Sequence, residues 1–115
     1  MNPDTMTVDE CREWIALDDG YKPTGYQGQF AMKYSKQEPN GEIAYYADAT
    51  QPTIDCAARC MPKEFWYKVC VNPNGRVDAY AERGFTSIDV AATDELTARY
   101  RLAVKCRMAL KTWNE

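Results

Sequence analysis

The sequence predicts an α+β domain in which an antiparallel sheet of about four strands packs against three helices, in the order α-β-β-α-β-β-α. Capping residues precede three segments whose apolar residues recur at helical spacing. Turn signals separate segments with alternating apolar and polar residues. No linker or internal repeat divides the 115 residues, so we expect residues 1–115 to form a single domain.

The first helix is predicted at about 8–18. Thr7 and Glu10 form a T-x-x-E capping box, and Met6 and Cys11 occupy the staple positions before and after the cap. The sequence Asp18-Asp19-Gly20 ends the helix, because glycine accepts a left-handed conformation there. The apolar stripe of this helix consists of Val8, Cys11, Trp14, Ile15 and Leu17.

A first hairpin is predicted within residues 29–47. The preceding segment 21–29, YKPTGYQGQ, reads as a loop because it contains two glycines and a proline. Phe30, Met32 and Tyr34 then alternate with less apolar residues, which is typical of a half-buried strand. A turn signal at 39–41 precedes a second strand at 43–47.

The middle of the chain predicts a short helix followed by a second hairpin. Thr53 caps a helix at 54–61 that Pro62 stops. The aromatic and β-branched run at 64–71 predicts a strand, and Asn72-Pro73-Asn74-Gly75 predicts a turn. The strand at 76–82 alternates, with Val77, Ala79 and Ala81 on one face and Asp78, Tyr80 and Glu82 on the other.

The last third of the chain predicts mainly a long helix. Residues 84–92 read as irregular, with a short strand near Ser87–Val90. Thr93 is expected to cap a helix from Asp94 to about Thr112, whose acidic first turn and basic end complement the helix dipole. Its predicted buried face consists of Leu96, Tyr100, Ala103, Val104, Cys106, Leu110 and Trp113.

Composition limits the chemistry of the chain. With no histidine among 115 residues, imidazole bases, histidine-activated nucleophiles and histidine-ligated zinc are excluded. Motifs typical of nucleotide binding are missing from the sequence. It contains no membrane-spanning run and no secretory signal pattern, so we expect a cytoplasmic protein without membrane contact.

Charge is unevenly distributed along the sequence. Residues 1–55 hold ten acidic and four basic residues, a net charge of −6, which leaves +3 for the remainder of a chain at −3. The acidic total argues against binding of duplex nucleic acid through its phosphates. The asymmetry suggests either steering of a charged partner or an uneven composition without a role.

Five cysteines without a secretory signal are expected to remain mostly free thiols that pack in the core. Cys56 and Cys60 lie one helical turn apart and offer half of a thiolate zinc site, but their spacing is not that of a zinc knuckle. Cys56 also lies near a helix start, where a reactive thiol is favoured. Core packing is the preferred interpretation, and no metal, cofactor or catalytic residue is assigned.

The candidate binding residues come from the acidic and tyrosine-rich N-terminal half. Eight tyrosines exceed what one buried face needs, and tyrosine is enriched at protein interfaces. The glycine-rich loop after the first helix is suited to recognition. The predicted contacts are Asp18, Asp19, Tyr21, Tyr26 and Glu42.

Three stretches resemble small proteins of tailed phages and prophages that carry the phage ABA sandwich domain. They are MTVDECREWIALDDGYK (6–22), PTIDCAARCM (52–61) with FWYKVCVNPNGRVDAYAE (65–82), and AVKCRMALK (103–111). The resemblance implies an α/β sandwich encoded by a phage accessory gene. It supplies no catalytic or binding residues for these positions.

These observations favour a non-enzymatic, phage-encoded interaction protein that binds and inhibits a host protein or protein–nucleic-acid complex, in its most concrete form an anti-CRISPR-type protein. A second hypothesis is an oligomeric sponge for a signalling nucleotide. Its phosphates would meet Arg99, Arg101 and Lys105, and its base would stack on Tyr80 or Trp66. A third is a self-associating structural protein, with a homodimer as its simplest form.

Overall fold

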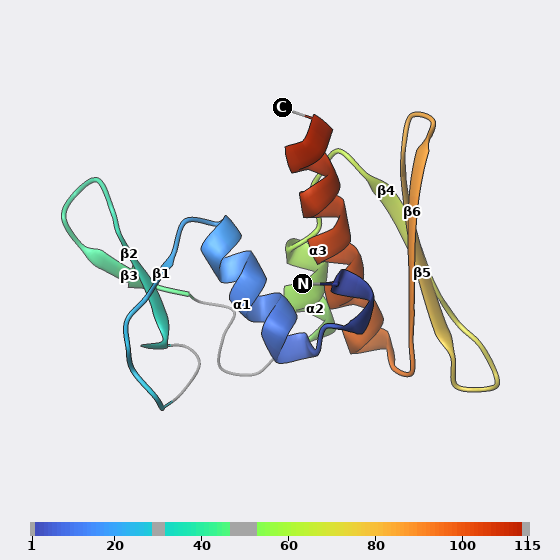
Figure 1. Cartoon of the computed structure of the whole chain (residues 1–115), viewed down its shortest axis with the longest axis horizontal. Helices are drawn as coiled ribbons and strands as arrows, with labels where there is room; N and C mark the ends of the chain where they lie inside the picture. The colour runs from blue at the N-terminus through green and yellow to red at the C-terminus, as the bar shows by residue number, and fades with distance from the viewer. Residues whose placement is uncertain (1, 29–31, 47–52, 114–115) are drawn as a thin grey trace.

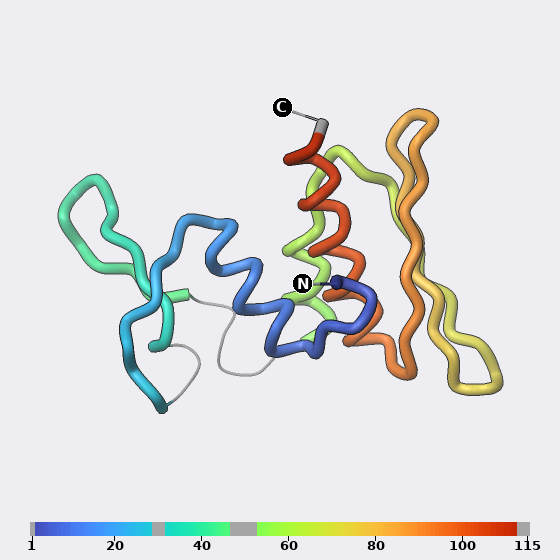
Figure 2. Tube along the Cα trace, viewed as in Figure 1, coloured from blue at the N-terminus to red at the C-terminus, as the bar shows by residue number. Residues whose placement is uncertain are grey.

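The computed structural model describes residues 2–28, 32–46 and 53–113, and it confirms the α+β class. The path of the chain through these elements is shown in Figures 1 and 2. In chain order the elements are η1 (Pro3–Thr5), α1 (Val8–Asp18), β1 (Lys22–Pro23), β2 (Tyr34–Gln37), β3 (Ile43–Tyr45), α2 (Ile54–Arg59), β4 (Trp66–Val71), β5 (Val77–Arg83), β6 (Thr86–Ala92) and α3 (Glu95–Trp113).

Within the described residues the strands form two antiparallel sheets of three strands each, so the predicted single sheet of about four strands is not confirmed. Sheet A has the order β1-β2-β3 and sheet B the order β4-β5-β6. Helix α3 is central, with α1 and α2 packed on one side of it and sheet B on the other (Figure 1). Sheet A lies beyond α1, which gives the molecule extents of 45 × 33 × 24 Å. The two hairpins cannot share a sheet because the helices separate them.

Helix α1 has the predicted bounds and the predicted cap. The Thr7 hydroxyl accepts from the Glu10 N–H at 3.2 Å, and the Glu10 carboxylate accepts from the Thr7 N–H at 3.1 Å. Met6 and Cys11 are both buried in one cluster, as the staple positions require. Leu17, which was expected in the apolar stripe, is exposed instead.

Sheet A differs from the predicted hairpin at its first strand. Lys22 and Pro23, expected in a loop, form the edge strand β1, a position that tolerates proline because an outward N–H is not needed. The second strand begins at Tyr34, so Met32 precedes it, while Phe30 and Ala47 lie outside the described residues. The strand expected from residue 43 is confirmed over Ile43–Tyr45.

Helix α2 begins at its predicted cap and ends earlier than expected. The Thr53 hydroxyl accepts from the Cys56 N–H at 3.1 Å. The α-helix covers Ile54–Arg59, with Cys60 as its C-cap, instead of continuing to Met61. The spacing of apolar residues along this helix predicts an apolar face of Ile54, Ala57, Ala58 and Met61; of these, Ala57 is buried and Ile54 is exposed.

Sheet B contains the predicted second hairpin and one further strand. The pairing of β4 with β5 and the turn at 72–75 are confirmed. Residues 86–92, expected to be largely irregular, form the full strand β6. The connection is a two-residue turn of Gly84 and Phe85, in which Gly84 has a φ of 61°.

Helix α3 begins one residue later than predicted, and its cap is Asp94 instead of Thr93. The Asp94 carboxylate accepts from the Thr97 N–H and from the Thr97 hydroxyl, both at 2.8 Å. The helix is buried on two sides, with Tyr100 and Val104 facing α1 and α2 and Leu102 facing sheet B. None of the helices in the described ranges combines the length and the apolar character that crossing a bilayer requires.

Candidate binding surface

Sheet B has one covered face and one uncovered face. The covered face packs on α3, and its buried contacts are made by Val77, Ala79, Ala81 and Val90 with Ala98, Leu102 and Cys106. Because successive strand residues point to opposite faces, the residues between them point away from α3. In the part of the chain that the structure describes, no helix packs on this outer face (Figure 1). The outer face of sheet B consists of Trp66, Lys68, Cys70, Asp78, Tyr80, Glu82, Ser87, Asp89 and Ala91.

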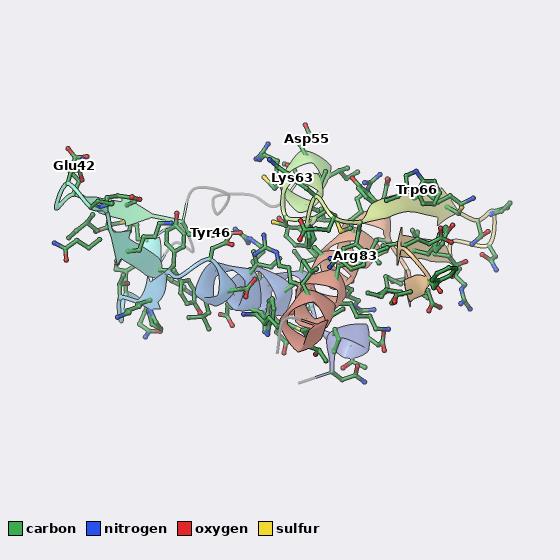
Figure 3. All side chains as sticks on the ribbon, turned by 90° about the horizontal axis from the view of Figure 1, so that it is seen from above. Glu42, Tyr46, Asp55, Lys63, Trp66 and Arg83 are labelled. Atoms are coloured by element: carbon green, nitrogen blue, oxygen red, sulfur yellow. The ribbon has the colours of Figure 1, made fainter. Side chains whose placement is uncertain are left out.

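An aromatic pair lies on this outer face. The rings of Trp66 and Tyr80 meet edge to face, with centroids 5.6 Å apart and planes inclined by 76°. Trp66 remains 58% exposed, at one end of the edge strand β4 (Figure 3). The Tyr80 hydroxyl donates to Glu82 Oε1 at 3.1 Å, and loss of solvent together with this acceptor raises the pKa of Tyr80. The pair therefore offers a large, stiff contact area with a polar edge.

The charges on the outer face are mainly acidic. Three carboxylates, those of Asp78, Glu82 and Asp89, share this face with one cation of the strands, Lys68. Asp78 accepts from Arg76 Nε at 2.9 Å and from Asn72 Nδ2 at 2.8 Å, and these hydrogen bonds lower its pKa. Arg76 therefore already neutralises Asp78, so the acidic character of this face rests on Glu82 and Asp89.

A fully exposed phenylalanine stands beside this face. Phe85 is the second residue of the β5–β6 turn, and its side chain is fully exposed to solvent. At the turn, Arg83 of β5 pairs with Thr86 of β6. The neighbouring residue of β5, Glu82, pairs with Trp66 of β4. Phe85 and Trp66 therefore lie at the same end of sheet B.

Asp18 and Asp19, predicted as contacts, are ion-paired within the chain: Asp18 is mostly buried, and Asp19 is exposed. Arg107 Nη1 donates to Asp18 Oδ2 at 3.0 Å and to Asp19 Oδ1 at 2.7 Å, and its Nε donates to the Cys60 carbonyl at 2.9 Å. Lys111 Nζ lies 2.6 Å from Asp18 Oδ1. Burial alone would lower the pKa of Arg107, but the hydrogen bonds to both aspartates and the charge of Asp19 raise it. These acids join the end of α1 to α3.

Ion pairs between the N-terminal part of the chain and α3 also account for the uneven charge of the sequence. Lys105 Nζ lies 2.9 Å from Asp4 Oδ1, so a second cation of α3 neutralises an acid of the N-terminal segment, which runs beside the helix (Figure 2). Asp9 lies 3.1 Å from Arg12 within α1. The acidic first part and the basic last helix thus attract one another within the chain, a use that the sequence alone does not reveal.

The three other predicted contacts do not form one surface. Tyr21 is half-buried, packs edge to face on Tyr46 at 5.3 Å and has the Lys36 ammonium 4.6 Å above its ring. Tyr26 is exposed in the loop after β1, and Glu42 is exposed at the β2–β3 turn, at the opposite end of sheet A. Figure 3 places Glu42 and Trp66 near opposite ends of the molecule.

The residues proposed for a nucleotide do not converge within one chain. Arg99 pairs with Glu95 at 2.8 Å on the helix itself. Arg101 donates to the carbonyls of Met6 and Ala91, and Lys105 donates to the Asp89 carbonyl. All three lie on the helix that covers the inner face of sheet B, whereas Trp66 and Tyr80 lie on the outer face.

Four of the five cysteines are buried free thiols, as expected, and Cys70 is exposed on the outer face of sheet B. Burial raises the pKa of Cys11 and of Cys106 to about 12. Cys56 Sγ accepts from Arg59 Nη2 at 3.2 Å. Across residues 2–28, 32–46 and 53–113, no three metal-binding side chains cluster to hold a metal ion.

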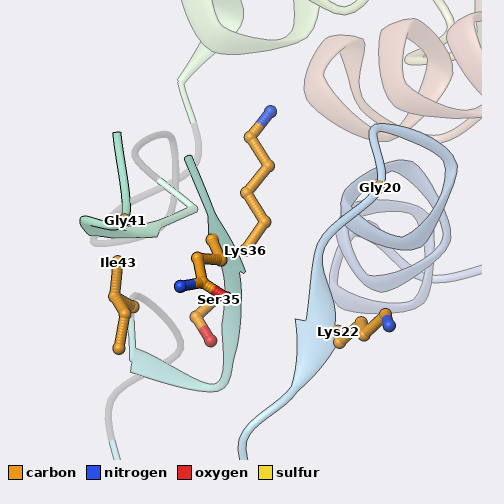
Figure 4. Close-up of a pocket in the computed structure, with 7 residues that line it drawn as sticks. Gly20, Lys22, Ser35, Lys36, Gly41 and Ile43 are labelled. Atoms are coloured by element: carbon orange, nitrogen blue, oxygen red, sulfur yellow. The ribbon is translucent and has the colours of Figure 1, made fainter. Parts of the chain in front are cut away.

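An open cleft of about 580 Å³ lies between the end of α1 and sheet A (Figure 4). Its lining consists of Gly20, Lys22, Ser35, Lys36, Gln37, Gly41 and Ile43. Among the described residues that line the cleft, Lys22 and Lys36 carry ammonium groups and none carries a carboxylate.

Comparisons of the chain with protein-family models, with curated proteins and with solved structures found no match.

Proposed function

We propose that the chain is a non-enzymatic binding protein and that the outer face of sheet B, together with Phe85, is its recognition surface. The exposure of Trp66 and Phe85 at one end of an uncovered sheet supports this most strongly. Full burial of a large apolar side chain stabilises by about 1.5–3 kcal/mol, which these two side chains do not obtain within the chain. A few residues supply most of the binding energy in protein interfaces, and tryptophan is among the residue types enriched there.

The partner that best complements this surface is a protein with a basic surface. Glu82 and Asp89 lie beside the aromatic pair, and the interface would set cations of the partner against them. The acidic and tyrosine-rich surface expected from the sequence is thus kept as the mode of binding. We assign this surface to sheet B instead of to Asp18 and Asp19, because cations of α3 already neutralise those two acids.

The most concrete form of this function is inhibition of a host complex whose basic groove binds nucleic acid. An acidic surface competes with phosphates for such a groove, and the resemblance to phage proteins agrees with a host target. The structure adds a stiff aromatic pair among the carboxylates, which gives such a contact a desolvated centre.

Calorimetry with purified CRISPR effector complexes tests this form of the proposal. We expect binding that weakens with added salt and that is lost in the Glu82→Lys, Asp89→Lys double variant. A matched control, Glu38→Lys, Glu42→Lys, reverses two charges on sheet A and is expected to bind normally. Binding that depends on Glu38 and Glu42 instead, or on neither pair, would reject sheet B as the surface. Absence of binding to every complex would reject the anti-CRISPR form.

A further inference from the structure

The hydrogen-bond register of the β4–β5 hairpin determines which backbone groups reach the free edge of sheet B. The Asn72 N–H donates to the Arg76 carbonyl at 2.8 Å, so this opposed pair is hydrogen-bonded. Since hydrogen-bonded and non-hydrogen-bonded pairs alternate in an antiparallel ladder, the N–H and C=O groups of Tyr67, Val69 and Val71 point away from β5. Within the described residues no strand pairs with this edge of β4.

The other edge of sheet B is closed by charged side chains. Arg101 Nη1 donates to the Ala91 carbonyl at 3.2 Å, and Lys105 Nζ donates to the Asp89 carbonyl at 2.9 Å. Charged groups at an edge prevent pairing with another chain. Among the described residues we find no such charge at the β4 edge, because the one charged residue of β4, Lys68, points to the outer face. The β4 edge can therefore pair with a further strand, whereas the β6 edge cannot.

We propose that β4 pairs antiparallel with β4 of a second copy of this chain, with the two-fold axis at Val69. This register engages all three outward-facing residues, since Val69 lies opposite Val69 of the second copy and Tyr67 lies opposite Val71. Lys68 then lies opposite Cys70. A register centred on Lys68 would oppose two lysines, and like charges directly opposite destabilise a sheet.

The side chains of β4 fit this partner. Val71 is 64% exposed, and Tyr67 and Val69 are half-buried on the inner side of the edge. In the proposed register Tyr67 of each copy covers Val71 of the other. A two-fold axis perpendicular to the sheet keeps both α3 helices on one face and joins the two outer faces into one surface. This inference does not depend on the proposed function, although it would double the recognition surface.

Light scattering during size exclusion tests the dimer, with a mass twice 13.1 kDa as the expected result. Val71→Pro removes an outward N–H and no hydrogen bond within the chain, and we expect it to raise the dissociation constant at least about tenfold. Val71→Thr retains the N–H and the branched shape and is expected to remain dimeric. A monomeric wild type at millimolar concentration, or a dimer that Val71→Pro leaves intact, would overturn the proposal.

A cross-link tests the register, also in the case that Val71→Pro fails to fold. Lys68→Cys places a thiol opposite Cys70 of the second copy in a non-hydrogen-bonded pair, about 4.5 Å apart at Cα, which suits a disulfide. With diamide as the oxidant, which takes up the two electrons and two protons released by the thiols, we expect a covalent dimer. The control Lys68→Cys, Cys70→Ser is expected to give none. Absence of the covalent dimer in Lys68→Cys would overturn the proposed register.

Discussion

Arg107 and Asp18 form an ion pair of 3.0 Å between α3 and the end of α1, and their side chains are only 16% and 13% exposed. The two residues stand 89 positions apart in the sequence. Because Arg107 also donates to Asp19 and to the Cys60 carbonyl, one side chain of α3 joins the ends of α1 and α2. The acids at 18 and 19 therefore have a structural role that local sequence patterns do not show.

We expect Arg107→Ala to lower the free energy of unfolding by about 1–2 kcal/mol, because Asp18 Oδ2 and the Cys60 carbonyl lose their donor while Lys111 remains beside Asp18 Oδ1. Urea denaturation followed by circular dichroism measures this. The control is Arg76→Ala, which removes the exposed pair with Asp78 and should change stability very little. Equal stability of the two variants would contradict the assigned role of Arg107.

The cap of α3 gives a second prediction about stability. Asp94→Ala removes the acceptor of the Thr97 N–H and should cost about 1 kcal/mol, whereas Thr93→Ala should cost almost nothing. Thermal denaturation of the two variants measures the difference. If Thr93→Ala proves the more costly change, the helix begins where the sequence alone suggested.

Alkaline pH is expected to destabilise the fold through buried thiols. The pKa of Cys11 and Cys106 is about 12 in the fold, against 9.0 in the unfolded chain. Above pH 9.0 the unfolded chain releases these protons while the folded chain retains them, so the unfolded state gains stability as the pH rises toward about 12. The slope is at most about 1.4 kcal/mol per pH unit for each thiol.

Urea denaturation of wild type and of Cys106→Ala at a series of alkaline pH values isolates this effect. The variant has a smaller buried side chain, which is expected to lower its stability at neutral pH, and one thiol fewer to titrate. We therefore expect its stability to fall less steeply with pH than that of the wild type. Identical slopes would show that Cys106 does not contribute.

Thiol labelling at neutral pH is expected to show one cysteine that reacts rapidly with the reagent. Cys70 is exposed, whereas the four others are buried. A chromogenic disulfide reagent should therefore react with one thiol rapidly in the native protein and with all five in urea. Cys70→Ser should lose the fast phase, and a fast phase that persists in this variant would mean that another cysteine is accessible.

Local signals predicted much of the fold. The capping box of Thr7 and Glu10, the Thr53 cap and the turn at 72–75 depend on residues a few positions apart, and all three are confirmed. Strand β6 was predicted only over Ser87–Val90, although Gly84 at the first position of a two-residue turn is itself a hairpin signal. Its alternation of Ile88 and Val90 with polar residues was a usable signal.

The candidate surface depends on relationships that the sequence does not contain. Alternation correctly placed Asp78, Tyr80 and Glu82 on one face of a strand. Which face α3 covers is a matter of tertiary packing, as is the neutralisation of Asp18 by Arg107. Spacing along the chain therefore predicted faces and caps but could not separate exposed acids from paired ones.

The measurement that tests the recognition surface most directly is quantitative mass spectrometry of host proteins captured by three immobilised forms of the chain. These are the wild type, the Trp66→Ala, Phe85→Ala double variant and Ile43→Ala. Ile43 is a matched control because it is similarly exposed but lies on sheet A. We expect at least one protein to be captured equally by wild type and Ile43→Ala and at least about tenfold less by the double variant. Capture of the same proteins by all three forms would contradict the account.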